Sequence, residues 1–234
     1  MINSLSIIIP AYNEEALIES SLMHIQSGLE SMVNRYELII VDDGSTDATG
    51  EIIERLAAKD CRIKIVRHGK NAGKGAALIS GFKTAAMDWI LFTDADMQID
   101  IAHLPDFLEH AGDSNAVIGY RKIRSDSVLR RWISAVYGRV ASSLLGFRVH
   151  DAHCPFKLFN SRIIHALPLR THGFMIDTEL LYRIHRCGYE IKELPVISRA
   201  SANRTSSLKL WHVGVMLGEF IAIVKLRFMR GSRR

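Results

Sequence analysis

Short runs of apolar residues, rich in valine and isoleucine, alternate with longer amphipathic segments over the first 120 residues of the chain. The apolar runs predict β-strands at residues 6–10, 37–42, 63–67, 89–93 and 116–119. The segments between them predict helices at residues 14–31, 46–58, 74–86 and 101–111. Because the strands are apolar on both faces, we expect an α/β fold: a mostly parallel central sheet with right-handed crossovers and helices on both faces.

Beyond residue 120 the alternation becomes less regular. The pattern predicts, in order, a helix at residues 127–145, a strand at 156–159, a helix at 176–187, a strand at 190–196 and a polar loop at 198–207. An apolar helix at residues 208–229 comes last. No linker separates these segments, so we expect one domain at residues 1–207, followed by an amphipathic, basic helix and tail at residues 208–234.

The composition is that of an ordinary globular protein. Of the 234 residues, 48% are hydrophobic and 24% are charged, and the net charge is +5. The three cysteines are scattered without metal-ligand spacing, which indicates a reduced, cytosolic chain. The N-terminus begins with strand-like sequence, so no signal peptide is expected.

The predicted C-terminal helix is interrupted by polar side chains, among them His212, Glu219, Lys225 and Arg227. Its uncharged stretches are far shorter than the ~20 residues that a membrane-spanning helix needs. From residue 209 onward the chain carries six basic residues and one acidic residue. We therefore expect the helix to lie on a surface of lipid or protein, and its charge suits a membrane with anionic lipids.

Two aspartates one residue apart, Asp94 and Asp96, follow the predicted strand at residues 89–93. Their side chains point the same way because side chains alternate along an extended backbone. Two carboxylates at this spacing suit Mg²⁺ or Mn²⁺ and leave ligand positions for phosphate oxygens. Acid pairs at strand ends are common, but three other polar groups also follow strands, at residues 12–14, 42–45 and 71–75. Ligands of parallel sheets bind at the carboxyl ends of strands, so all four groups are expected at one edge.

The second of these groups is the acidic turn Asp42-Asp43-Gly44-Ser45. Asp42 ends its strand, Gly44 permits a sharp turn, and Ser45 or Thr46 can cap the next helix. A carboxylate at residue 42 can accept a hydrogen bond from the ring N–H of uracil or guanine. Capping alone explains Ser45 and Asp47 equally well.

The glycine-containing loop Asn71-Ala72-Gly73-Lys74-Gly75 leads into a helix, where backbone amides and the helix N-terminus favour an anion. It lacks the spacing of both the phosphate loop and the dinucleotide motif, and a plain helix entry remains an alternative. Lys74 stands at a helix start, where a positive charge is unfavourable. This placement indicates an anionic partner, and we include Lys74 among the substrate-binding candidates.

Basic residues form two further groups. The first comprises Arg121, Lys122, Arg124, Arg130 and Arg131, and the second comprises Arg204 and Lys209 with Ser206 and Ser207. Arginine can bind two phosphate oxygens at once, and a polar loop can close over a site, although both groups also suit ordinary exposed surface. No aromatic residues suited to base stacking are interleaved with them, so nucleic acid is not an expected partner.

Taken in order, IIIPAYNEE, VDDGSTD, NAGKGAA, DADMQ, DAHCPFKLF, FMIDTELLYRIHRCGYEIKELPV and RTSSLKL resemble the motifs of family 2 glycosyltransferases with the GT-A fold. The resemblance is strongest to the branch that contains dolichyl-phosphate mannose synthase and dolichyl-phosphate glucosyltransferase. It implies a metal-dependent, inverting enzyme that moves a hexose from a nucleotide sugar, of the UDP-glucose or GDP-mannose type, to polyprenyl or dolichyl phosphate. Such an enzyme would be peripheral on the cytoplasmic, inner face of the membrane, and a homo-oligomer is compatible with it.

The resemblance also implies roles for individual residues. The base and ribose of the donor would be held by Pro10, Ala11, Tyr12, Glu14 and Asp42, with Asp43 beside them. The metal and the donor diphosphate would be held by Asp94, Asp96 and Gln98. Acceptor phosphate or donor pyrophosphate would face Arg121, Arg131 (or Arg130) and Lys157, while Arg204 and Lys209 would belong to a closing loop. The expected catalytic residues are therefore Asp94, Asp96, Arg121 and Arg131.

One departure concerns Pro155, where the family usually has glycine; proline removes a donor and fixes the backbone, which bears on the acceptor side. A phosphate acceptor is already anionic and needs no general base, whereas a hydroxyl acceptor needs one. The first alternative is therefore a family 2 enzyme acting on a saccharide or small-molecule hydroxyl, with Asp177 or Glu179 as base. Helix-start electrostatics for Asp177 and structural support for Glu179 are the simpler interpretations. The second alternative is a nucleotide-sugar-binding protein without activity.

Overall fold

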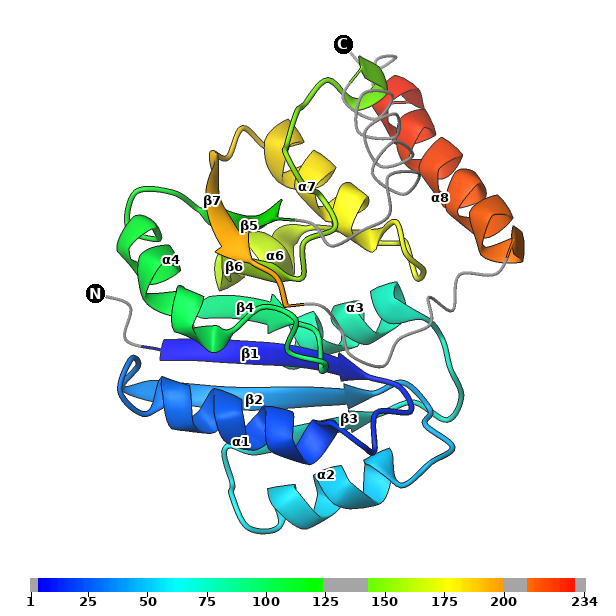
Figure 1. Ribbon diagram of the computed structural model, residues 1–234. Coiled ribbons are helices and arrows are strands. Elements are labelled where there is room, and N and C mark those ends of the chain that lie inside the picture. Colours follow the sequence, from blue (N-terminus) through cyan, green and yellow to red (C-terminus); the bar gives the residue numbers. More distant parts are fainter. Residues whose placement is uncertain (1–3, 124–142, 200–209, 230–234) are drawn as a thin grey trace.

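The computed structural model describes residues 4–123, 143–199 and 210–229 (Figure 1). These residues form a seven-stranded sheet with the order β3-β2-β1-β4-β6-β5-β7. The strands are β1 (Ser4–Ala11), β2 (Arg35–Asp42), β3 (Ile63–Arg67), β4 (Trp89–Thr93), β5 (Ala116–Ile123), β6 (Phe156–Asn160) and β7 (Ile191–Ile197). Neighbours are parallel except where β6 pairs with β4 and with β5. The mostly parallel α/β sheet predicted from the apolar runs is thereby confirmed.

Most predicted helices are present with shifted ends. They are α1 (Ile18–Leu29), α2 (Thr49–Ala57), α3 (Lys74–Thr84) and α7 (Ile176–Arg186). The segment predicted as one helix at residues 101–111 divides into a 3-10 turn (Ile101–His103) and α4 (Leu104–His110). Pro105 stands in the first turn of α4, where its missing N–H costs nothing, so a new helix begins there. The short helix α6 (Ser161–Ala166) was not predicted.

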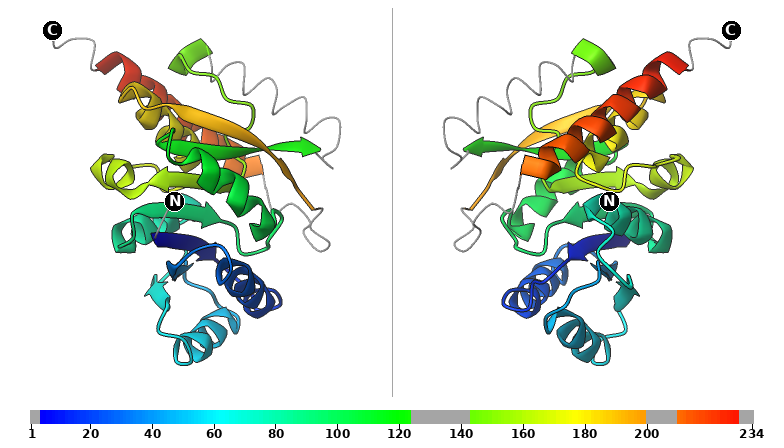
Figure 2. Two further views of the ribbon diagram at one scale, coloured as in Figure 1. Left: turned by 90° about the vertical axis from the view of Figure 1, so that its left-hand side faces the viewer. Right: turned by 90° about the vertical axis from the view of Figure 1, so that its right-hand side faces the viewer.

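Helices cover both faces of the sheet because side chains alternate along each strand (Figure 2). On β1, Ile7 and Ile9 belong to a core shared with α1, α2 and α4. Ile8, between them, belongs to the opposite core, which it shares with α3, α6 and α7. All three isoleucines are fully buried, as expected for a strand that reads as a continuous apolar run.

Helix α8 (Leu210–Met229) lies beside α7 (Figures 1 and 2). Its Phe220 and Ile223 pack against Met175 and Tyr182, in a small cluster separate from the two main cores. None of the helices described here combines the length and hydropathy needed to cross a membrane. The predicted boundary between a domain at residues 1–207 and a terminal segment remains a prediction.

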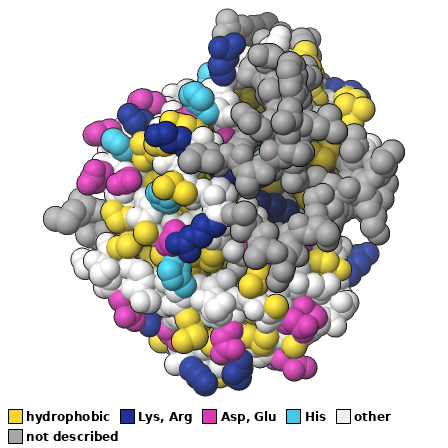
Figure 3. Space-filling view, in the orientation of Figure 1, with side chains coloured by type: hydrophobic (Ala, Val, Ile, Leu, Met, Phe, Trp, Pro, Cys, Tyr) yellow, Lys and Arg dark blue, Asp and Glu magenta, His cyan; other side chains and the backbone are white. Residues whose placement is uncertain are grey.

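Several predicted features lie outside the described residues. They are most of the helix at residues 127–145, most of the loop at 198–207, the end of the tail, and the candidates Arg124, Arg130, Arg131, Arg204, Ser206, Ser207 and Lys209. On the face drawn in Figure 3, acidic and basic side chains of the described residues are interspersed.

Candidate active site

The carboxyl ends of β1, β2 and β4 bring the predicted polar groups to one edge of the sheet. Ala11, the last residue of β1, pairs with Asp42, the last residue of β2. Strand β4 runs parallel to β1 on its other side, and Asp94 follows its last residue. Strand β6 is antiparallel, so its first residues lie at this same edge, where Phe156 pairs with Thr93. The convergence expected from sequence is therefore present.

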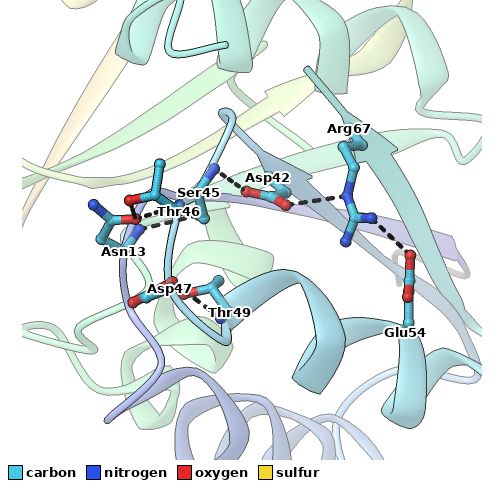
Figure 4. A network of polar contacts seen from close by, with 8 residues as sticks. All are labelled: Asn13, Asp42, Ser45, Thr46, Asp47, Thr49, Glu54 and Arg67. Carbon is cyan, nitrogen blue, oxygen red and sulfur yellow. Dashed lines mark hydrogen bonds and ion pairs between the residues drawn. The ribbon is translucent and has the colours of Figure 1, made fainter. Parts of the chain in front are cut away.

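Hydrogen bonds join the loop after β1 to the turn after β2 (Figure 4). The Asn13 side chain accepts from the Thr46 amide at 2.8 Å, and the Asn13 amide donates to Ser45 Oγ at 3.1 Å. Asp47 accepts from the Thr49 hydroxyl at 2.6 Å. Asp47 also accepts from the Thr49 amide at 3.0 Å, at the start of α2, which supports the capping interpretation for Asp47, whereas the Ser45 hydroxyl contacts Asn13 and does not cap the helix. The contacts of Asn13 fix the two loops relative to each other.

Asp42 is buried beneath this turn, with only 2% of its surface exposed. Its Oδ1 accepts from the Ser45 amide at 2.9 Å, and its Oδ2 lies 3.2 Å from Nε of Arg67, which also pairs with Glu54 (Figure 4). Each carboxylate oxygen has two lone pairs, so a nucleobase N–H would share Asp42 with these partners. A base-binding role for Asp42 therefore stays a prediction.

The other predicted nucleoside contacts surround this turn. Tyr12 is 43% exposed at the edge, whereas Ala11 is buried and Pro10 is half-buried. The Glu14 amide donates to Thr49 Oγ1 at 2.8 Å, and the residue as a whole is 9% exposed. An aromatic ring that is open to solvent beside a fixed polar turn suits contact with a nucleoside.

Asp43 has a different task from its neighbour, because its carboxylate holds the glycine-containing loop. It accepts from the Ala72 amide at 2.9 Å and from the Gly73 amide at 2.8 Å. His68 Nδ1 lies 2.7 Å from the same carboxylate, and His68 Nε2 lies 2.9 Å from Ser80 Oγ. Asp43 is thus placed to fix the backbone just before Lys74 rather than to meet a ligand.

The anionic partner of Lys74 is a carboxylate of the protein itself. Nζ of Lys74 lies 2.9 Å from Oδ1 of Asp94, and both side chains are about a quarter exposed. Burial disfavours the charged ammonium, but the carboxylates of Asp94, Asp177 and Asp96 outweigh it and raise the pKa of Lys74. Gln98 Nε2 donates to Asp96 at 2.8 Å, which orients the second carboxylate of the pair.

A second, fully buried ion pair lies behind this one. The Lys157 ammonium contacts Oδ1 of Asp177 and the carbonyl oxygen of Cys154, each at 2.6 Å, and none of its side chain is exposed. Burial opposes the charge of Asp177, but Lys157 and Lys74 hold the pKa of Asp177 well below its ordinary value. Lys157 therefore faces Asp177 rather than the open edge, and direct phosphate contact would require it to leave this pair.

Two further predicted residues have protein partners. Arg121 makes a two-pronged pair with Asp151, at 2.7 and 3.1 Å. Glu179 is 1% exposed and accepts from the backbone amides of Arg170 and Thr171 at 3.0 and 2.7 Å. Although burial opposes its charge, these donors, together with Arg183, lower the pKa of Glu179. Glu179 therefore supports the structure, as the simpler of its two interpretations proposed, and its low pKa makes it a poor base.

The residues at the edge fit a hard divalent cation that is shared with a ligand. No cluster of three or more His, Cys, Asp or Glu suited to a metal exists within the described ranges. Asp94 and Asp96 offer two carboxylates, and the contact of the Lys74 ammonium with Asp94 shows that this position attracts a cation. Mg²⁺ is commonly held by one or two carboxylates plus substrate phosphates, which matches this donor set.

Three residues that organise the edge had no role in the sequence-based prediction: Asn13, which was expected at the edge only as part of residues 12–14, and Arg67 and His68. Asn13 has a φ of 54°, a left-handed conformation that asparagine tolerates better than most residues. Its position between a strand end and a helix was the available signal. The partners of Arg67 and His68 lie 12 to 25 residues away in the chain, so no local pattern could have indicated them.

The sheet with its acidic carboxyl edge has the architecture of the GT-A class. A solved structure of glucosyl-3-phosphoglycerate synthase from Mycobacterium tuberculosis, in complex with Mn²⁺, UDP and phosphoglyceric acid, superposes with a TM-score of 0.73. The two proteins are 24% identical, and the match covers 96% of this chain and 78% of the other. A second structure of that enzyme, with Mg²⁺ and UDP, gives a TM-score of 0.72 at 23% identity, covering 96% and 79% of the two chains. This likeness establishes the fold.

The family follows from the sequence comparisons. The model of Glycosyl transferase family 2 matches residues 6–167. Glycosyltransferase AglD of Haloferax volcanii is 32% identical over 201 residues, which is 82% of this chain and 32% of the relative. The undecaprenyl-phosphate 4-deoxy-4-formamido-L-arabinose transferase of Pseudomonas paraeruginosa is 32% identical over 189 residues, or 76% and 56% of the two chains. The chain belongs to glycosyl transferase family 2, and it spans about a third and about half of the length of these two relatives.

Proposed function

We propose that the protein is an inverting glycosyltransferase that moves a hexose from a nucleotide sugar to a polyprenyl or dolichyl phosphate. The observation that carries this proposal is the placement of Asp94 and Asp96, with Lys74, at the carboxyl edge of the parallel sheet. Two carboxylates and a lysine there suit a metal-bound diphosphate. We assign the activity to residues 1–207 and membrane contact to residues 208–234.

On the donor side, the loops after β1 and β2 would bind the nucleoside. Tyr12 would contact the base or ribose, and Asp42 would accept from the base N–H, with Pro10, Ala11 and Glu14 shaping the contact. Asp94, Asp96 and Gln98 would hold a divalent metal with the diphosphate. When bound, that metal would neutralise charge on the departing diphosphate. Lys74 would exchange its contact with Asp94 for a diphosphate oxygen.

On the acceptor side, a phosphate oxygen would attack the anomeric carbon of the sugar. The bond from that carbon to the diphosphate breaks, the diphosphate takes the electron pair, and the configuration inverts. No proton has to be removed, which agrees with the two base candidates being engaged elsewhere: Asp177 with Lys157, and Glu179 with Arg183. A relative named for an undecaprenyl-phosphate acceptor supports this choice.

Exposed side chains of helix α8 support a peripheral position on a membrane, and we assign that position to its cytoplasmic face. The outward side of α8 exposes Val215, Leu217 and Ile221 by 43%, 58% and 46%, with Lys225 exposed one turn further on. An apolar helix face next to basic residues suits the headgroup region of an anionic bilayer. A lipid acceptor would be reached most directly from such a position.

A thermal-shift experiment with nucleotide sugars tests the donor and metal assignments. UDP-glucose or GDP-mannose at 100 times its Kd, with Mn²⁺, should add about 2.7 kcal/mol of stability, which is about 5 to 11 °C for a chain of this size. Asp96→Ala should remove most of the metal-dependent shift. The control Asp113→Ala removes an exposed carboxylate just before β5, at the opposite edge of the sheet. This variant should keep the metal-dependent shift. A full metal-dependent shift in Asp96→Ala would refute the metal assignment.

Transfer assays decide the acceptor. The wild-type protein should transfer sugar to a polyprenyl phosphate in detergent or vesicles, with little loss of rate at high pH. Transfer to hydroxyl acceptors alone, with a rate that depends on Asp177 or Glu179, would instead identify a saccharide-directed enzyme. Binding of donor without transfer to either acceptor would identify a nucleotide-sugar-binding protein.

A further inference from the structure

The acidic side chain of α8 points into the protein. The Glu219 carboxylate accepts hydrogen bonds from the backbone amides of Gly173 at 2.8 Å and Met175 at 3.1 Å. Both amides lie just before the first turn of α7, which begins at Ile176. A carboxylate at a helix N-terminus is favourable because it meets unpaired N–H groups and the positive end of the helix dipole. This contact explains why an acid interrupts an otherwise apolar stretch of α8.

The same short segment, residues 170–175, touches the glycine-containing loop on its other side. The carbonyl oxygen of His172 accepts from the Ala76 amide at 3.0 Å. Gly75 lies so close to Thr171 and His172 that an added Cβ would overlap their backbone atoms. The segment is therefore packed between Glu219 and the first turn of α3, where Lys74 is the first residue.

Glu179 fixes the near end of the segment through the amides of Arg170 and Thr171, while Glu219 fixes its far end. Glu179 belongs to α7, which is held in the main core that contains Ile8. Glu219 belongs to α8, which packs through a separate and smaller cluster. Of these two anchors, Glu219 is therefore the one that ties an outer helix to the edge of the sheet.

We propose that Glu219 is a positioning residue that couples α8 to Lys74. Its carboxylate holds residues 173–175, the His172 carbonyl holds the Ala76 amide, and this backbone contact sets where the Lys74 ammonium lies relative to Asp94. On the proposed function, which this inference extends, contact of α8 with a lipid surface steadies the diphosphate-binding lysine.

Amide hydrogen exchange in the ligand-free protein tests the coupling directly. In Glu219→Gln, exchange of the Gly173 and Met175 amides should accelerate about tenfold or more, since they lose a charged acceptor. The coupling predicts that the Ala76 amide, which does not touch Glu219, accelerates as well. The Leu38 amide in β2 should be unchanged, and the control Lys225→Gln, an exposed charge on the same helix, should leave all four amides unchanged. Normal exchange at Ala76 in Glu219→Gln would overturn the proposal.

A double-mutant cycle provides a second test that does not depend on one variant folding well. An alanine at residue 173 would overlap the Glu219 carboxylate, although the backbone there does not require glycine. Gly173→Ala alone should therefore accelerate exchange at Ala76. In a Glu219→Ala background the added methyl group meets no carboxylate and should have little further effect. Additive effects of the two changes would contradict the proposed contact.

Ligand binding separates this inference from the proposed function. With Mn²⁺ present, Glu219→Gln should bind UDP-glucose or GDP-mannose about fivefold more weakly than the wild type, because Lys74 is less well placed. If the wild type binds neither donor while Ala76 responds as expected, the proposed function fails and the coupling stands. If the wild type binds a donor and neither Ala76 exchange nor donor affinity changes in the variant, the coupling fails alone.

Discussion

Replacing Lys74 by methionine tests the charge arrangement at the proposed metal site. The Lys74 ammonium lies 2.9 Å from Asp94 Oδ1, and 24% and 27% of the two side chains are exposed. At this distance and an effective dielectric constant of about 20, the gross Coulomb attraction is about 6 kcal/mol. Partial exposure and desolvation remove most of it, which leaves a net coupling of about 2 kcal/mol.

Methionine keeps much of the length of the side chain but removes the charge that competes with a metal for Asp94. Mg²⁺ or Mn²⁺ alone should therefore bind Lys74→Met about 30-fold more tightly than the wild type, which corresponds to about 2 kcal/mol. The donor should respond in the opposite direction. With Mn²⁺ present, its affinity should fall about tenfold because the diphosphate loses a cationic partner.

Titration calorimetry measures both affinities. Lys83→Met is a matched control, because it removes one positive charge from an exposed position at the other end of α3. That variant should bind metal and donor as the wild type does. An unchanged or weaker metal affinity in donor-free Lys74→Met would refute the view that Lys74 occupies a cation position.

Two further predictions concern stability. Asp43→Ala removes a buried carboxylate and leaves the Ala72 and Gly73 amides and His68 without their acceptor. It should lower the free energy of unfolding in urea by about 3 kcal/mol, and a loss below about 1 kcal/mol would contradict the clamp assigned to Asp43. Because the pKa of Glu179 is lowered in the folded protein, the unfolded chain binds a proton at this residue more readily. The Glu179 carboxylate therefore stabilises the fold above its ordinary pKa of 4.5, and this contribution is lost as the pH falls below that value. Glu179→Gln should be less stable than the wild type at pH 7 and should lose stability less steeply below about pH 4.5 in acid titrations. Parallel titration curves for the variant and the wild type would contradict this.

The sequence alone predicted the sheet because the physics of its strands is local. A strand covered on both faces must be apolar at every position, as at Ile7, Ile8 and Ile9, and such runs are visible without any knowledge of neighbours. The convergence of residues 42 and 94 followed from the general rule that parallel strands present their carboxyl ends to one edge. The subdivision at Pro105 and the short helix α6 were missed because they depend on packing and capping over a few residues.

The sequence by itself determined the family motifs, the parallel sheet and the identity of the acidic edge. Only the tertiary structure decided the partner of each charged side chain: Asp94 for Lys74, Asp177 for Lys157, and the backbone amides of Gly173 and Met175 for Glu219. These partners are between 20 and 46 residues apart, so no local period or spacing encodes them. A buried charge is stable only beside an opposite charge or a hydrogen-bond donor, and the folded chain alone fixes which one is within reach.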